Sequence, residues 1–529
     1  MSILSVSFLL FALGLCVVYF LAPKRFQWWV LLAFSLAFYA LGGLLNLPWL
    51  LLTAFSTWGA AHYIQKHAEA EKAFLAAHKA DLSKEERSAR KAKGKKLRRR
   101  VMVLCILLNI GVLCAFKYVH FLLAQADAVA ALFGGHVTDS VRWIVPLGIS
   151  FYTFQTVGYL CDVYWGKTGA ERNPLKLLLF TSFFPQITQG PISGWKDLSG
   201  ELFAPHSLDY DRFSLGAQRM IWGFFKKMVV ANILSGYVEK VFANYGSYTG
   251  VAVFLGALCY AAQIYADFYG YMDIMCGLCQ ILGIRLTENF ERPYFSKSIA
   301  EYWRRWHISL GVWFKNYVYY PIAMAKWNQK LGKNAKKRLG KAFGSYLPAT
   351  LALVATWLAT GLWHGASWSY IAWGGVNGLF IIFSMWMEGP YGKWKKALRI
   401  NESSWLWRAF QVGRTFLLVT FIKVLPEVGT LSDGLGLWKR IFTEHSVPHS
   451  LTELLPFVDT YRNLAAVLLG VLLMLLVSLL QRKGSVRDWM GRKLPYLIRI
   501  WIYVALFFLI LYFGVPASGG LGGFMYAEF

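Results

Sequence analysis

The sequence predicts an all-α protein that crosses a membrane many times. Of its 529 residues, 57% are hydrophobic and 16% are charged, whereas an ordinary soluble domain carries about 25% charged residues. A spanning helix needs about 20 mostly apolar residues, so the recurring apolar stretches predict about ten to twelve transmembrane helices, with re-entrant or interfacial helices beside them. The stretches run over residues 3–22, 27–43, 48–61, 101–124, 143–161, 250–266, 346–363, 371–387, 463–480 and 497–515.

The first apolar stretch has neither a charged region before it nor a small-residue cleavage site after it. We therefore expect it to remain as the first span instead of being removed as a signal peptide. Because no Pro-, Gly- or Ser-rich linker sets off a soluble domain, the chain is expected to form one integral unit. We divide it into N-terminal spans with a basic arm over 1–100, a core over 101–400 and C-terminal spans over 401–529.

Two strongly basic segments set the expected orientation. Residues 84–100 contain ten Lys or Arg and two Glu, and residues 330–341 contain six basic residues and no acidic one. Short segments rich in Lys and Arg stay in the cytoplasm, so both are expected to be cytoplasmic loops beside anionic headgroups. Lys24 and Arg25 agree with this orientation, which puts the N-terminus outside. The net charge of +27 is thereby explained by loops, without a nucleic-acid partner.

Several common catalytic signatures are missing from the sequence. The seven cysteines are scattered, and Cys276 and Cys279 have no second Cys/His pair at a spacing that would complete a zinc site. Gly166-Lys167-Thr168 resembles the end of a phosphate-binding loop, but Cys161 stands where the leading glycine belongs. A G-x-S-x-G nucleophile elbow does not occur either. We expect no metal site.

The segment 299–326 combines aromatic and cationic residues. If the segment is one helix, one of its faces carries Trp306, Leu310, Trp313 and Tyr317. Arg304 and Lys315 then lie close together on a different face. Trp303 and His307, four residues apart, are neighbours on the helix surface. Ionisable residues at membrane depth normally face a cavity or the interior of the bundle. The segment could contact an anionic ligand with Arg304, Arg305 and Lys315. Alternatively, it is an interfacial anchor whose arginines extend to the headgroups.

His364 is the second histidine in an apolar, aromatic setting. It follows an apolar helix, lies between Gly361 and Gly365, and has Trp363 beside it. Small residues let another backbone or a ligand approach closely. A lone histidine of this kind is often a packed core residue, but His307 provides a partner. Two buried imidazoles that converge on a cavity suit proton transfer, because burial favours the neutral base.

The residues around these histidines carry a resemblance to a known family. "RPYFSKSIAEYWRRWHISLGVWFKNYVYYPI", followed by "GLWHGASW", resembles the membrane-bound O-acyltransferase family, in particular its bacterial branch of alginate O-acetyltransferase-like proteins. "FFPQITQGPISGW" (183–195), "ADFYGYMDIMCGL" (266–278) and the final "GGFMYAEF" are also similar to that branch. Tyr269 departs from the pattern, which expects a smaller residue and so leaves the shape of the acyl pocket open.

The resemblance implies a ring of helices around a tunnel that contains His364 as general base, with His307 orienting the reactants or stabilising the oxyanion. It implies transfer of an acyl group, typically acetyl, from acetyl-CoA or another thioester in the cytoplasm to hydroxyls of an exported polysaccharide, directly or through an extracytoplasmic partner. From their charge and position, not from the resemblance, we expect Arg304, Arg305 or Lys315 to hold the phosphates of coenzyme A, with Trp303 and Trp363 beside the substrate. The protein would lie in the inner membrane of a bacterium, among its lipids, with no bound cofactor.

Two alternatives remain open at the level of sequence. A relative within the same family passes D-alanine from a carrier protein to teichoic acid and shares both histidine motifs. A non-enzymatic transporter or polysaccharide-export component would need intramembrane charges to form a relay, for which Asp162, Asp267 and Asp273 are available. Inverted-repeat transporters show paired interrupted helices, and the sequence shows no such pair.

Overall fold

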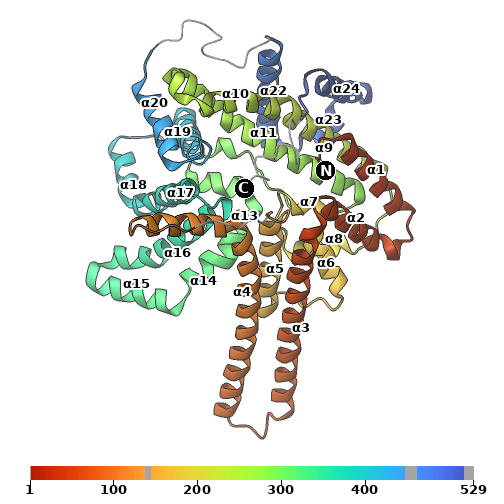
Figure 1. The fold of residues 1–529 in the computed structure, drawn as a ribbon, viewed down its shortest axis with the longest axis vertical. Helices are drawn as coiled ribbons and strands as arrows, with labels where there is room; N and C mark the ends of the chain where they lie inside the picture. The colour runs from red at the N-terminus through yellow and green to blue at the C-terminus, as the bar shows by residue number, and fades with distance from the viewer. Residues whose placement is uncertain (1, 138–143, 447–460, 517–529) are drawn as a thin grey trace. The chain divides into compact units, whose positions relative to one another are not determined.

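The computed structural model describes residues 2–137, 144–446 and 461–516, and the regular elements within these ranges are helices (Figure 1). The predicted all-α class is confirmed. The chain forms two compact units. The first unit comprises Val6–Asp209 and Cys279–Thr287, and the second comprises Tyr210–Leu278 and Glu288–Phe529. The division into 1–100, 101–400 and 401–529 stays a prediction.

The first unit is built around a long helical hairpin. Its helices are α1 Val6–Leu21, α2 Gln27–Leu41, α3 Leu47–Ala77, α4 Lys84–Ala131, α5 Ile149–Tyr164, α6 Pro174–Ser182, α7 Phe184–Ile187 and α8 Trp195–Leu202. Ser83 begins α4 with a capping box, in which its hydroxyl accepts from the Glu86 N–H and the Glu86 carboxylate accepts from the Ser83 N–H. Arg98 and Glu71 form an ion pair of 2.9 Å across the hairpin.

The second unit contains the other main helices, except that the last residues of α11, from Cys279 on, belong to the first unit. They are α9 Tyr210–Phe224, η3 Phe225–Ala231, α10 Asn232–Ala243, α11 Gly250–Leu282, η5 Pro293–Phe295, α12 Ile299–Arg305, α13 Ile308–Phe314, η6 Lys315–Tyr319, α14 Tyr320–Ala323, α15 Lys326–Leu339, α16 Lys341–His364, α17 Trp368–Trp386, α18 Glu388–Ala397, α19 Trp405–Val424, α20 Leu431–Thr443, α22 Tyr461–Leu480, η7 Gln481–Lys483, α23 Val486–Lys493 and α24 Tyr496–Phe513. The elements η3 and η6 are π-helical, a form that is frequent at functional sites.

Five helices among the described residues are long and apolar enough to cross a membrane: Lys84–Ala131, Gly250–Leu282, Lys341–His364, Arg462–Lys483 and Tyr496–Phe513. The total rises to seven if each of two bent helix pairs counts as one span. A polytopic membrane protein is therefore confirmed, although the described residues provide fewer long apolar helices than the ten to twelve predicted. The difference arises because helices such as α1, with 16 residues, are short.

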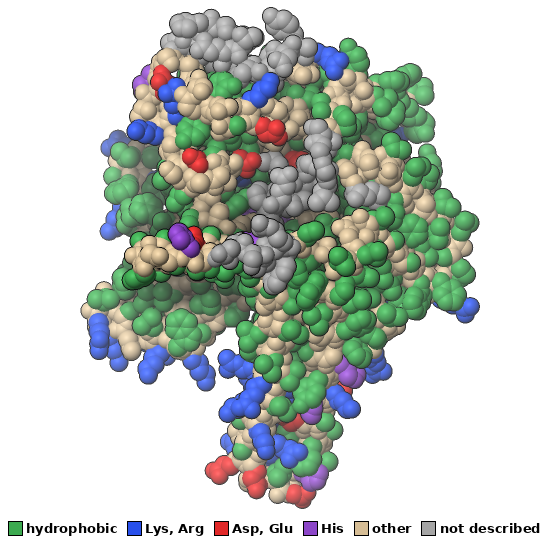
Figure 2. Space-filling model, in the orientation of Figure 1, with side chains coloured by type: hydrophobic (Ala, Val, Ile, Leu, Met, Phe, Trp, Pro, Cys, Tyr) green, Lys and Arg blue, Asp and Glu red, His purple; other side chains and the backbone are tan. Residues whose placement is uncertain are grey.

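The two basic segments are helical, so their prediction as loops was wrong. Residues 84–100 form the first turns of α4, and most of 330–341 belongs to α15. Figure 2 shows Lys and Arg side chains gathered near the turn of the α3–α4 hairpin. A run of Lys and Arg favours helix as strongly as most apolar residues do. Solvated helical arms can carry the same positive charge as loops.

The segment 299–326 is not the single helix that its periodicity predicted. Helix α12 ends at Arg305, Trp306 is extended and forms a bridge with Phe290, and His307 has a left-handed backbone with φ of 47°. Helix α13 starts only after this break. The helical wheel that put Arg304 and Lys315 on one face, and made Trp303 adjoin His307, therefore does not apply.

Candidate active site

His364 is the last residue of α16 and is buried, with 5% of its surface exposed. The ring centroids of Trp363 and Trp373 each lie 4.8 Å from its imidazole, and the ring of Tyr370 lies parallel at 6.4 Å. Gly361 makes this packing possible, because a Cβ there would lie 2.5 Å from the carbonyl oxygen of Tyr370. The predicted close approach is thus made by the backbone of α17.

His307 lies in the break between α12 and α13 and is almost completely buried. Asn289 holds this turn: its side-chain oxygen accepts from the Ser309 N–H at 3.0 Å, and its backbone oxygen accepts from the Ile308 N–H at 3.1 Å. The ring of Phe268, on α11, meets the imidazole edge-on at 4.9 Å. A left-handed backbone at a residue other than glycine is costly and persists only where the surroundings enforce it. The fold therefore fixes this side chain.

One indole contacts both histidines. The ring centroid of Trp363 is 6.1 Å from that of His307 and 4.8 Å from that of His364. The structure therefore brings together the two side chains that the sequence singled out. Burial lowers the pKa of His307 to about 3, so that imidazole is neutral near pH 7.

The predicted substrate-binding tryptophans join the same aromatic cluster. Trp363 is the indole that contacts both histidines. Trp303 is half-buried, donates from its indole N–H to the Asn377 side-chain oxygen at 2.9 Å, and lies 5.4 Å from Trp373, which itself contacts His364. Both tryptophans are therefore placed near the reactive imidazoles. A binding role for them stays a prediction.

The three predicted cations are not gathered into one site. Arg304 is exposed at the end of α12, and Arg305 forms an ion pair of 2.6 Å with Glu301. Lys315 is exposed in η6, where its ammonium lies 5.6 Å from the ring centroid of Tyr320. Each can meet an anion from solvent, but no ion pair or hydrogen bond joins them within the described residues.

The sequence interpretation missed Lys423, which lies on α19 beside the histidine turn. Its side chain is buried, and its Nζ lies 3.3 Å from the ring centroid of Trp306, the residue before His307. The hydroxyl of Tyr294 is 3.3 Å from the same Nζ. Burial lowers the pKa of Lys423 well below its ordinary value. A lysine within the apolar run "FLLVTFIKVL" was the available signal.

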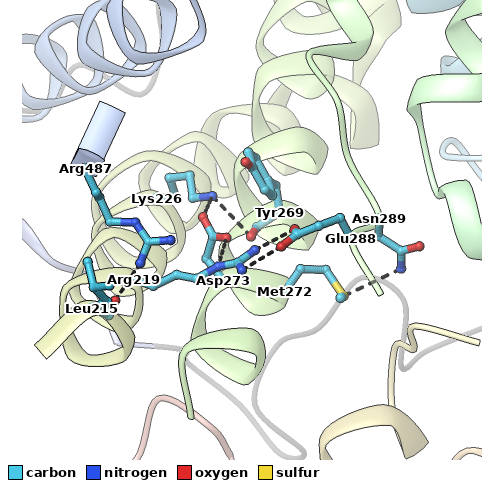
Figure 3. A network of polar contacts seen from close by, with 9 residues as sticks. All are labelled: Leu215, Arg219, Lys226, Tyr269, Met272, Asp273, Glu288, Asn289 and Arg487. Carbon is cyan, nitrogen blue, oxygen red and sulfur yellow. Dashed lines mark hydrogen bonds and ion pairs between the residues drawn. The ribbon is translucent and has the colours of Figure 1, made fainter. Parts of the chain in front are cut away.

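A network of buried charges on η3, α9 and α11 was also missed (Figure 3). Asp273 accepts from Lys226 at 2.5 Å and from Arg219 at 2.8 Å, and Arg219 also forms paired bonds of 2.7 Å with Glu288. The ring of Tyr269, the residue that departs from the family pattern, lies 3.3 Å from the Lys226 ammonium. The adjacent lysines in "FFKKMVV" were the signal.

The remaining acids considered for a relay also have basic partners. Lys227 forms an ion pair with Asp267, and Lys167 lies 3.4 Å from Asp162. Among the residues that the structure describes, no group of three or more His, Cys, Asp or Glu could hold a metal ion.

Comparison with known proteins accounts for this arrangement. Residues 170–391, which include both histidines, match the membrane-bound O-acyltransferase (MBOAT) family. Over these residues the chain is similar to members of this family. The final "GGFMYAEF" that also supported the resemblance lies outside the described residues.

Individual MBOAT relatives agree with the bacterial branch. The chain is 34% identical over 344 residues to a probable alginate O-acetylase AlgI of Pseudomonas aeruginosa, covering 65% of this chain and 60% of that protein. It is 30% identical over 304 residues to a peptidoglycan O-acetyltransferase of Helicobacter pylori, covering 53% and 54%. It is 29% identical over 280 residues to a teichoic acid D-alanyltransferase of Bacillus subtilis, covering 52% and 67%. The match thus spans about three fifths of the alginate O-acetylase.

Proposed function

We propose that this protein is an O-acetyltransferase that moves acetyl from acetyl-CoA, or from another acyl thioester, to hydroxyls of an exported polysaccharide, directly or through an extracytoplasmic partner protein. The observation that carries the proposal is the pair His307 and His364, both buried and both in contact with the ring of Trp363. The similarity to two relatives, a probable alginate O-acetylase and a peptidoglycan O-acetyltransferase, supports the acetyl group and the polymer acceptor.

In the proposed reaction His364 acts as the general base. It takes the proton of the acceptor hydroxyl while the hydroxyl oxygen attacks the thioester carbon. The tetrahedral intermediate collapses by breaking the carbon–sulfur bond, and the proton on His364 passes to the leaving thiolate. A positioned base of this kind contributes about 10² to 10⁴-fold in rate.

His307 is proposed to stabilise the oxyanion of that intermediate. Its pKa of about 3 keeps the imidazole neutral, so it has a ring N–H to donate without carrying a charge that the buried site would penalise. Its fixed backbone limits the reorganisation that would otherwise accompany charge development. Neither step requires a metal ion.

The donor is proposed to enter from the cytoplasm of a bacterium, with the protein in the inner membrane. The basic segments on α4 and α15 support this orientation. Arg304 and Lys315, both exposed, are the proposed contacts for the phosphates of coenzyme A, and Arg305 would first have to leave Glu301. The paired state of Asp267 and Asp273 weighs against a charge relay for polysaccharide export.

The test is acyl transfer by the purified protein in proteoliposomes, with labelled acetyl-CoA inside and polysaccharide outside. We expect transfer by the wild type and loss of transfer by His364→Ala. His206→Gln is the matched control, because that histidine lies on the first unit. Its ring contacts the Glu201 carbonyl oxygen at 2.8 Å, and its bonds to Gln27 come from the backbone, which the substitution keeps. Transfer from a D-alanyl carrier protein, but not from acetyl-CoA, would contradict the proposed donor.

A further inference from the structure

The second unit contains a cavity of about 600 Å³ that the acyl-transfer reaction described above does not use. Its lining comes from α9, α11, the segment 288–292, α22, α23 and α24, and it includes Ile308, the residue after His307. Sites for small organic ligands typically have volumes of about 300 to 1,000 Å³. The cavity is therefore large enough for a specific ligand.

One wall of the cavity is apolar and belongs to two candidate spans. Leu473 and Val477 contribute from α22, and Ile502 and Leu506 contribute from α24. Only 28% of the apolar window of α22 and 11% of that of α24 is buried. In a bilayer, the remaining surface of both helices would contact acyl chains. The molecules with the most direct access to this wall are therefore components of the membrane itself.

The cavity lining also contains charged residues. Within the network of Figure 3, Arg219 and Lys226 are balanced by Asp273 and Glu288 through the ion pairs described above. These four side chains together carry no net charge. They do not by themselves select an anion or a cation.

Three further charged residues decide the sign of the net charge around the cavity. Arg292 and Arg487 line the cavity, and neither forms an ion pair within the described part of the chain. Glu291 also lines the cavity and is the opposing acid. The Nη1 of Arg487 donates to the backbone oxygen of Leu215 at 2.6 Å, which orients the guanidinium without neutralising it. The lining residues themselves balance, with three arginines against Asp273, Glu288 and Glu291. Lys226, which pairs with Asp273 but does not line the cavity, brings the sum to one positive charge. Planar guanidinium groups bind phosphate oxygens well.

Part of the polar lining also lies where a spanning helix stops. Gln481 and Ser485, which line the cavity, immediately flank Arg482 and Lys483 at the end of α22. Basic residues at such a position mark the cytoplasmic interface, where anionic lipids reside. The apolar wall therefore suits the acyl chains of a lipid, and the cationic residues suit its phosphodiester.

We propose that this cavity binds an anionic phospholipid, with its phosphodiester at Arg487 and Arg292 and an acyl chain against α22 and α24. The bound lipid would border Ile308 and support the turn that holds His307. Acetyl-CoA also carries phosphates, but its acetyl group is too short to use the apolar wall. The proposal concerns lipid binding alone and stands apart from the proposed reaction.

The test is native mass spectrometry of the full-length purified protein with phosphatidylglycerol and, separately, with phosphatidylcholine of the same acyl chains. We expect one phosphatidylglycerol to be retained at least fivefold more strongly than phosphatidylcholine. Arg487→Gln should remove that preference. Arg492→Gln, an exposed arginine on the same helix that does not line the cavity, should keep it.

A second variant, Val477→Trp, fills the apolar wall and leaves every charge in place. It should weaken phosphatidylglycerol retention and should also reduce the rise in unfolding temperature that this lipid gives to the wild type. Equal retention of both lipids, or equal loss in the Arg487 and Arg492 variants, would overturn the proposal. So would displacement of the bound lipid by acetyl-CoA, because the cavity would then serve the donor.

Discussion

Two regions of the second unit bury ionisable side chains in opposite ways. At the histidine site, His307 and His364 are surrounded by the aromatic rings of Phe268, Trp363 and Trp373. At the π-helix η3, by contrast, Lys226 and Lys227 each meet a carboxylate of α11.

The difference shows what each region can do. Aromatic surroundings penalise the charged imidazole and leave a neutral base or donor, as the lowered pKa of His307 illustrates. Carboxylate partners instead hold the lysine charges in place and tie η3 to α11. We therefore interpret the first region as the place of the reaction. The second region is a clamp of ion pairs that keeps α11, and with it Phe268, in position.

The largest expected effect separates chemistry from packing. His364→Gln keeps much of the side-chain volume but provides no base near neutral pH, so we expect the transfer rate per folded molecule to fall by about 10² to 10⁴-fold. The unfolding temperature should change little. Near-normal turnover by monodisperse His364→Gln protein would remove this residue from the mechanism.

The clamp should show the reverse pattern. Asp273→Asn leaves Lys226 and Arg219 without their shared carboxylate, and removal of one partner of a buried pair typically costs about 3 to 5 kcal/mol. We expect a lower unfolding temperature and lower yield, with turnover per folded molecule retained.

The double variant Asp273→Asn with Lys226→Met is the control for that interpretation. Because it removes the uncompensated ammonium, it should recover part of the lost stability. Thermal unfolding followed by size-exclusion chromatography measures both variants. An unchanged unfolding temperature for Asp273→Asn would show that the network is not a clamp.

The sequence was sufficient for the fold class and for the positions of most apolar helices. Each predicted stretch with described residues overlaps a helix, because uninterrupted apolar composition reports the bilayer environment directly. Helices that combine apolar and charged residues, such as α9 with η3 and α19, were missed. Their charges are buried by partners far away in sequence, as Lys226 is by Asp273, and no local pattern contains that information.

The candidate site was predicted in part. Motif spacing found His307 and His364, and their aromatic neighbours were visible as adjacent tryptophans. The break in the helix at Trp306 could not be predicted from the sequence, because it depends on a backbone bridge to Phe290 and not on a Pro or Gly. For this reason, the expected cationic helix face with Arg304 and Lys315 does not exist.

A smaller effect concerns pH. The pKa of His307 falls from 6.5 in the unfolded chain to about 3 in the folded protein, so the unfolded chain binds more protons between these values. Stability should therefore fall as pH drops through 6.5 towards 3, by at most about 1.4 kcal/mol per pH unit. His307→Gln should lessen this slope in thermal unfolding measured from pH 8 to 5. Identical slopes in both proteins would contradict burial as the state of His307.

The smallest expected effects distinguish the exposed cations. Phosphate contacts are similar in ground and transition states, so Arg304→Gln should raise the KM for acetyl-CoA a few-fold more than it lowers kcat. Arg305→Gln should do less, because its guanidinium is already held by Glu301 at 2.6 Å. Lys330→Gln, in the basic segment of α15, is the matched control for general surface charge.

If all three variants raise KM equally, binding of the donor depends only on the overall positive charge of the basic surface. If none does, Arg304 is a headgroup anchor, and the cationic residues have no specific part in the chemistry at His307 and His364.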